Sequence, residues 1–317
     1  IRFLAGLSLN QDCRYWEIMD RFSRREMPSS QQYPEAATLW LCCAPGKWVL
    51  LLGILSWLLI VEGHGEAGMT SFTSEEYAFA GTGQMEAGWQ TVRLINRGRD
   101  VHQMQFLGLP PGKTVEDVNQ ALARRPGYLP QWLKRVGGVN SVASGNEASV
   151  VIYLDPGEYV LLCGIPDATG RPHAAHGMVR PLHVSELGSR VSAAPESDRT
   201  VRLRDFSFSW EEPVQAGDHI VQVSNEGTQA HELIVIRLVE GASTQDFLTS
   251  YRPGSAQNPA GAEIGGMTGI DPGRKTYVHI DMQPGRYGLI CFLADPVTRT
   301  PHFAYGMWMD LKVQLRP

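Results

Sequence analysis

The chain has 317 residues, of which 43% are hydrophobic and 19% are charged, and its formal net charge is −5. This length allows two domains of ordinary size with buried cores, together with additional segments. The negative net charge gives the whole chain no electrostatic reason to bind nucleic acid. The 33 glycines and 20 prolines favour many short strands joined by turns over a helical bundle.

An uncharged apolar run at residues 48–61 follows a basic N-terminal segment. We predict a cytoplasmic or interfacial segment over residues 1–44 and a single transmembrane helix over residues 45–62, because a helix of that length extends about 27 Å. Cations before the run and glutamates after it orient the N terminus toward the cytoplasm. A signal peptide is the alternative. We expect a retained anchor in a bacterial inner (cytoplasmic) membrane, with the following domains in the periplasm.

The rest of the chain contains an internal repeat. Four motifs recur in the same order at a separation of 128 or 129 residues, starting at Asn96 and Asn225, Gly137 and Gly265, Pro156 and Pro284, and Pro172 and Pro301. A conserved order with single-residue shifts indicates duplication. We therefore predict similar domains over residues 71–184 and 201–317, joined by a linker over residues 185–200.

Short alternating or β-branched runs predict strands in both domains. In the first domain they cover residues 75–80, 90–96, 102–107, 149–154, 157–163 and 178–184, and in the second residues 201–206, 219–223, 232–237, 275–280, 285–291 and 307–313. One helix is expected in each domain, over residues 114–124 and 243–251, with Thr114 and Ser243 as N-caps. Many strands without regular alternation with helices indicate a mainly β sandwich fold.

Each repeat carries a His, a distant Cys and a His-x4-Met motif. The two sets are His102, Cys163, His173 and Met178, and His231, Cys291, His302 and Met307. One thiolate and two imidazoles with a weak axial thioether form the type 1 copper site. The alternative is that these residues are core side chains only, since a lone Cys behaves as a small hydrophobe. The cofactor expected from the sequence is therefore type 1 copper in one or both domains, or none.

These motifs resemble those of the cupredoxin superfamily, the plastocyanin- and azurin-like blue copper proteins. The shared features are Asn-x-Gly-x-x-x-His, Gly-x-Tyr-x-x-x-Cys and Pro-His-x4-Met, and they occur in both repeats. The resemblance implies two tandem Greek-key β-sandwiches. The spacing from Cys to His, ten residues in the first repeat and eleven in the second, exceeds that of small electron-transfer cupredoxins and is more similar to that of copper nitrite reductases. The longer loops, which contain charged residues, would cover the His edge where partners usually dock.

We interpret the chain as a non-enzymatic, membrane-anchored periplasmic subunit that braces or docks components of a photosynthetic or respiratory membrane complex. Its layout is similar to that of extrinsic accessory subunits of bacterial photosynthetic reaction-centre–antenna complexes, which is an analogy at the level of fold. The alternatives are a type 1 copper electron-transfer protein and, less favoured, a copper oxidoreductase of the nitrite reductase type. The expected partners are an integral membrane complex and the lipid bilayer, without nucleic acid.

The sequence argues against a copper enzyme. A trinuclear copper cluster needs His-x-His pairs, and the chain has none. Nitrite reductases and laccases place a His directly beside the copper-ligating Cys, whereas the neighbours here are Leu162 and Gly164, and Ile290 and Phe292. We therefore expect no catalytic residues.

Overall fold

The computed structural model describes residues 69–186, 193–211, 213–252 and 258–316. The predicted segment over residues 1–44 and the predicted transmembrane helix over residues 45–62 lie outside these ranges. Among the described residues, no helix has both the length and the apolar character needed to cross a membrane.

The described chain is mainly β, and its two halves contain corresponding elements. The first half consists of β1 (Met69–Glu75), β2 (Ala78–Ala80), β3 (Gln84–Glu86), β4 (Gly88–Asn96), β5 (His102–Gly108), α2 (Val115–Arg124), β6 (Lys134–Val142), β7 (Glu147–Leu154), β8 (Gly157–Leu162), η1 (His173–His176) and β9 (Val179–Ser185). The second half consists of β10 (Arg199–Arg204), β11 (Ser207–Trp210), β12 (Val214–Gln215), β13 (Gly217–Asn225), β14 (His231–Leu238), α3 (Thr244–Ser250), β15 (Gly261–Ile270), β16 (Lys275–Met282), β17 (Gly285–Ile290), η2 (His302–Tyr305) and β18 (Trp308–Gln314).

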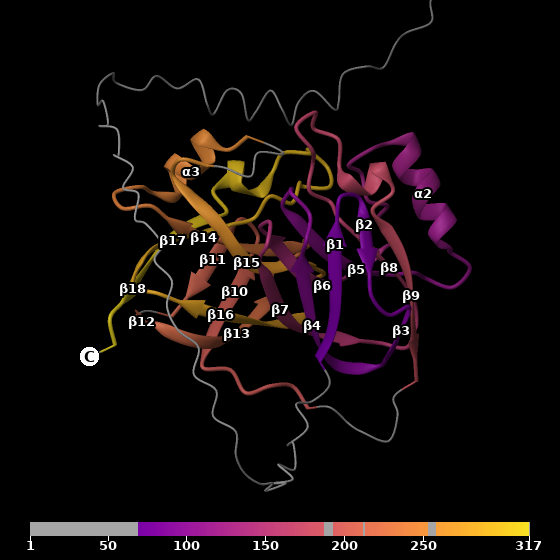
Figure 1. Ribbon diagram of the computed structural model, residues 1–317, viewed down its shortest axis with the longest axis horizontal. Coiled ribbons are helices and arrows are strands. Elements are labelled where there is room, and N and C mark those ends of the chain that lie inside the picture. The colour runs from indigo at the N-terminus through magenta and orange to yellow at the C-terminus, as the bar shows by residue number, and fades with distance from the viewer. Residues whose placement is uncertain (1–68, 187–192, 212, 253–257, 317) are drawn as a thin grey trace, which may run out of the picture.

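The strands form two sheets that both run through the two halves. Their orders are β11-β10-β13-β16-β7-β4-β1-β2 and β12-β18-β17-β14-β15-β6-β5-β8-β9-β3. The halves meet edge to edge, because β7 pairs antiparallel with β16 and β6 pairs antiparallel with β15. Outward from this seam, each half repeats the strand order of the other, like the subunits of a two-fold dimer within one chain. Figure 1 shows the first half, from indigo to magenta, beside the second, from orange to yellow.

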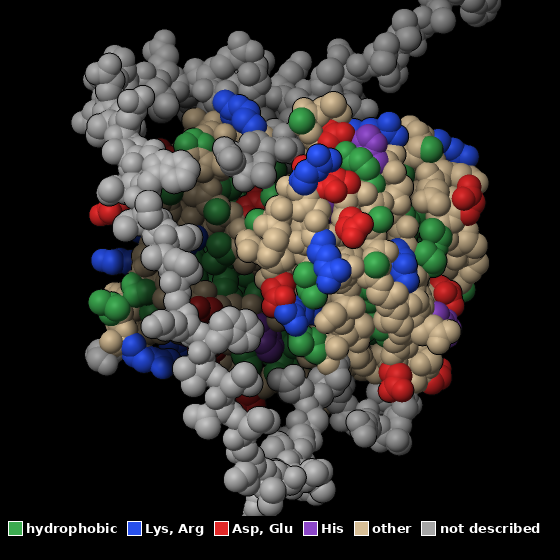
Figure 2. Space-filling model, in the orientation of Figure 1, with side chains coloured by type: hydrophobic (Ala, Val, Ile, Leu, Met, Phe, Trp, Pro, Cys, Tyr) green, Lys and Arg blue, Asp and Glu red, His purple; other side chains and the backbone are tan. Residues whose placement is uncertain are grey.

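Polar side chains reinforce the seam between the halves. Asn140 Nδ2 donates to Glu232 Oε2 at 3.2 Å, and Gln105 Nε2 donates to the carbonyl of Gly269 at 3.0 Å. At the surface, Arg274 pairs with Asp155 at 3.2 Å. Figure 2 shows acidic and basic side chains interspersed over the face in view. The charges on that face therefore form no patch of a single sign.

The main core lies between the two sheets. Phe72 of β1 and Phe106 of β5 come from opposite sheets, and their rings meet edge to face with centroids 6.2 Å apart. The cluster of buried apolar side chains around them continues through both halves. The helices α2 and α3 bury smaller clusters of their own against the outer side of the fold. Both begin with capping boxes at Thr114 and Ser243, which confirms the predicted N-caps.

Two predicted strands extend too far. The chain turns at Glu76 and Tyr77, so residues 75–80 belong to β1 and β2 rather than to one strand. Similarly, β10 ends at Arg204 and not at Phe206. Tyr77 and Phe206 have φ angles of 62° and 64°, in the left-handed region that ends a strand. The apolar alternation continues through both turns and conceals them.

The sequence also predicted no strand where β6 and β15 form the seam. Both contain a pair of glycines, which usually indicates a turn. In these strands glycine permits a close approach of neighbouring backbone instead. A Cβ at Gly138 would lie 1.9 Å from the carbonyl oxygen of Met104, and one at Gly266 would lie 2.0 Å from that of Leu233.

Candidate metal centres

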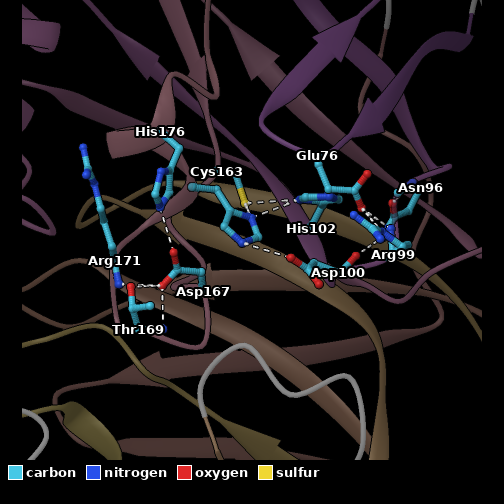
Figure 3. Close-up of polar contacts among 12 residues, drawn as sticks. Glu76, Asn96, Arg99, Asp100, His102, Cys163, Asp167, Thr169, Arg171 and His176 are labelled. Carbon is cyan, nitrogen blue, oxygen red and sulfur yellow. Dashed lines mark hydrogen bonds and ion pairs between the residues drawn. The ribbon is translucent and has the colours of Figure 1, made fainter.

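Each half brings three of its predicted ligands into one buried group. We name these groups the first centre and the second centre, and they consist of His102, Cys163 and His173, and of His231, Cys291 and His302. In each centre the ligand atoms lie within 4.8 Å of one another. The first His begins β5 or β14, the Cys directly follows β8 or β17, and the second His begins η1 or η2. Figure 3 shows the side chains of His102 and Cys163 turned toward each other.

Backbone hydrogen bonds hold the Cys, the second His and the Met in one loop. In the first half, Cys163 N donates to the carbonyl of Met178 at 3.3 Å, Met178 N donates to that of His173 at 3.1 Å, and Ala174 N donates to that of Cys163 at 2.8 Å. The second half repeats these bonds at 3.2, 3.0 and 3.0 Å for Cys291, Met307 and Phe303. Met178 and Met307 are fully buried. Their role as axial ligands stays a prediction.

An asparagine fixes the loop that leads to the first His. Asn96 Nδ2 donates to the carbonyls of Asp100 and Val142 at 2.7 and 2.8 Å, and its Oδ1 accepts from Gly98 N at 2.8 Å. Asn225 makes the corresponding bonds in the second half at 2.7, 2.9 and 2.9 Å. Each asparagine thereby ties its loop to a seam strand, which explains the Asn-x-Gly-x-x-x-His motif as a positioning element.

The spacing of the donor atoms fits a single metal ion. The two Nδ1 atoms are 3.1 Å apart in both centres. The thiol sulfur lies 3.5 Å from Nδ1 of the second His in both, and 4.0 Å from Nδ1 of His102 in the first. Metal–imidazole bonds of about 2.0–2.1 Å place two nitrogen ligands of one ion about 3–3.5 Å apart. Soft sulfur combined with two imidazoles suits copper better than a hard cation.

Burial sets the protonation of these groups. It lowers the pKa of His102 and His302 to about 4, and lowers that of His173 and His231 as well. The imidazoles are therefore neutral at pH 7 and have a free lone pair for a metal. Burial raises the pKa of the Cys163 thiol to about 12 and that of Cys291 well above its ordinary value. A metal must therefore displace the thiol proton when it binds.

Hydrogen bonds around the second centre leave both Nδ1 atoms as acceptors. His231 Nε2 donates to Asp205 Oδ1 at 2.9 Å, and His302 Nε2 donates to Gln229 Oε1 at 3.1 Å. The Gln229 amide nitrogen in turn donates to Asp295 at 2.8 Å, which fixes the orientation of the amide. A neutral imidazole carries one N–H, so the two Nδ1 lone pairs face each other. A cation bound to both relieves their repulsion, and this donor set therefore fits a metal.

Aromatic rings and the long Cys–His loops cover the second His of each centre. Tyr77 meets His173, and Phe206 meets His302, both with ring centroids 5.2 Å apart. His173 and His302 are 0% and 1% exposed, which agrees with the expectation of a covered His edge. In the first loop, Asp167 accepts hydrogen bonds from Thr169, from Arg171 N and from His176 Nε2, and Figure 3 shows these residues beside Cys163.

The sequence predicts the six residues that converge in the two centres, but not the residues that surround them. The apolar alternation predicts strands through Tyr77 and Phe206, and no motif gives Asp205 or Gln229 a role at the centres. A signal was present, because the repeat aligns Glu76 with Asp205 and Asp100 with Gln229. These pairs flank the ligands and differ between the halves. Their effect depends on side-chain direction, which the sequence does not specify.

A scan against protein-family models matches none, and a search of the curated proteins gives no match. Among solved structures, the chain is similar to reduced auracyanin from Roseiflexus castenholzii, with 18% identity over 38% of this chain and 99% of that one and a TM-score of 0.28. It is also similar to a blue copper oxidase from Nitrosomonas europaea, with 13% identity over 78% and 85% of the chains and a TM-score of 0.23. A copper nitrite reductase from Nitrosomonas europaea has 14% identity over 78% and 94% and a TM-score of 0.22. Identities and TM-scores this low carry no argument about function. A function for this chain must therefore be argued from its two buried centres.

Proposed function

We propose that the chain is an electron-transfer protein with a type 1 copper site in each half. The observation that carries this proposal is the pair of buried groups, in each of which one thiol and two imidazoles converge within 4.8 Å. Two imidazoles and a thiolate with a distant thioether are the ligands of blue-copper electron-transfer sites. Met178 and Met307 are the proposed axial ligands. The bound copper would supply a one-electron redox couple.

The chain contributes rigidity and exclusion of water. The ligands come from strands and hydrogen-bonded loops, so their positions need little adjustment when a charge changes. Burial of all six groups keeps solvent away from the ligand atoms. The backbone N–H of Gln103 points to Cys163 Sγ at 3.4 Å and favours its ionised form. A site with little reorganisation suits electron transfer, and we propose no catalysed reaction.

Visible absorption tests the proposal. Oxidised, copper-loaded protein should show an intense band from charge transfer between thiolate and copper, and reduction should bleach it. Cys163→Ser and Cys291→Ser should each remove part of the band, and the double variant should remove all of it. His279→Asn is the control, because His279 is an exposed histidine outside both centres. A band that survives in the double variant would rule out the assigned ligands.

A second candidate is a bracing subunit of a membrane complex, anchored through residues 45–62 with its β domains in the periplasm. The observation that favours it is the burial of His173 and His302, because partners of blue copper proteins usually dock at an exposed His edge. Removal of a brace should loosen the parent complex in isolated membranes while electron flow through the complex continues. Removal of a carrier should stop that flow and leave the complex intact.

A further inference from the structure

The two centres have the same ligands but different surroundings at the outer imidazole nitrogens. In the second centre, both Nε2 atoms donate to fixed acceptors, Asp205 Oδ1 and Gln229 Oε1. In the first centre, Nε2 of His102 and Nε2 of His173 are buried and have no hydrogen-bond partner among the described residues. The ligand set is therefore duplicated, while its supporting hydrogen bonds are present in only one half.

The corresponding residues of the first half do not replace these acceptors. Glu76, which matches Asp205 in the repeat, accepts from the backbone N–H of Arg99, just as Asp205 accepts from that of Thr228, but it makes no hydrogen bond to Nε2 of His102. Asp100, which matches Gln229, lies 3.9 Å from His173 Nε2, beyond hydrogen-bond distance. In Figure 3, Glu76 lies near His102, and the dashed line from its carboxylate leads to Arg99.

This difference affects which imidazole nitrogen carries the proton. A metal held by both Nδ1 atoms requires the proton of each neutral imidazole to sit on Nε2. In the second centre, Asp205 and Gln229 stabilise that arrangement before a metal arrives. In the first centre, it would bury two N–H donors without acceptors, which is unfavourable. The 3.1 Å separation of Nδ1 of His102 from Nδ1 of His173 also allows an N–H···N bond that competes with a metal.

We propose that Asp205 and Gln229 are positioning residues that hold the histidines of the second centre in the metal-binding tautomer, so that the second centre binds copper more tightly than the first. This inference rests on the proposed copper-binding function. One unsatisfied buried donor should weaken binding by about tenfold or more. At limiting copper, the second centre therefore fills before the first.

Nitrogen-15 NMR of the copper-free chain with labelled histidine tests the tautomers without any metal. His231 and His302 should be in the Nε2–H form, and at least one of His102 and His173 should carry its proton on Nδ1. Loss of individual signals in single His→Asn variants assigns them. The same Nε2–H form at all four histidines would overturn the inference.

Copper affinity tests the consequence. Cys163→Ser leaves only the second centre and Cys291→Ser leaves only the first, and each variant is titrated with Cu(I) against a competing chelator. The second centre should bind at least about tenfold more tightly. Equal affinities, or tighter binding by the first centre, would refute the inference. Absence of copper binding in both variants would refute the proposed function instead, while the NMR result would still decide the tautomers.

Two further substitutions separate a positioning role from a general structural one. Gln229→Met, in the Cys163→Ser background, removes the acceptor with little change in size and should weaken copper binding by about tenfold. Gln283→Met is the matched control, because Gln283 is exposed in the short connection between β16 and β17 and its side-chain amide donates to Asp281 rather than to a histidine of either centre. Asp100→Gln, in the Cys291→Ser background, should strengthen the first centre. Weaker binding with Gln283→Met as well, or no change with Gln229→Met, would contradict the assigned role.

Discussion

At the scale of single residues, the convergence of the candidate ligands was the most predictable part of the molecule. Each ligand type occurs at the same place in both repeats, so the eight candidates stood out from the other histidines and methionines. The structure brings the His, Cys and His of each set together. The residues that tune them were not predictable. Asp205 bonds to His231 and Gln229 to His302 only because two separate turns bring these side chains together.

Gly138 provides a prediction about stability. Its φ is 143°, and an added Cβ would lie 1.9 Å from the backbone oxygen of Met104. Gly138→Ala should therefore destabilise the protein by more than about 2 kcal/mol, because backbone must move at the centre of a sheet. Urea unfolding measures the loss. Gly83→Ala is the control, since a Cβ at Gly83 meets nothing within 4 Å, and an equal effect of both changes would contradict the account.

At the scale of elements, most strands could be predicted because one face of each is buried and alternation is visible in the sequence. Both helices were predicted with the correct N-caps. The seam strands β6 and β15 could not be predicted in this way, because each lies between two other strands and is covered on both faces. Their residues are buried almost without alternation, and glycine replaces side chains where backbones approach closely.

The seam also contains a titratable group. Glu263 of β15 lies beside Ser141 of β6, and burial raises the pKa of the Glu263 carboxyl from 4.5 to about 7. The folded chain thus retains a proton that the unfolded chain releases, so stability should fall as the pH rises from about 4.5 to 7. Glu263→Gln should increase the free energy of unfolding at pH 8 and leave it nearly unchanged at pH 4. Urea unfolding at both pH values measures this difference, and an effect of equal size at both would contradict the assigned burial.

At the scale of the whole molecule, the two duplicated halves are joined to each other and are not independent domains. The repeat in the sequence predicted similar halves, but nothing in it showed that their edges would join. In the structure both sheets continue across the seam, and one apolar cluster includes buried residues from each half. Edge pairing also removes exposed strand edges, which are otherwise sites of aggregation.

A shared core predicts cooperative unfolding of the two halves. Differential scanning calorimetry of the copper-free chain should give one transition, with a calorimetric enthalpy equal to the van't Hoff enthalpy. Leu94→Ala, which opens a cavity at a fully buried position in the first half, should lower the temperature of that single transition. Two separated transitions, with only one affected by Leu94→Ala, would show that the halves unfold independently.

The central claim is that each half holds one copper ion through its own His, Cys and His. The most direct test is the copper content per chain after copper loading and removal of weakly bound metal. The account predicts two ions in the original chain, one in Cys163→Ser, one in Cys291→Ser and none in the double variant. A chain that retains no copper, or variants that retain as much as the original, would contradict it.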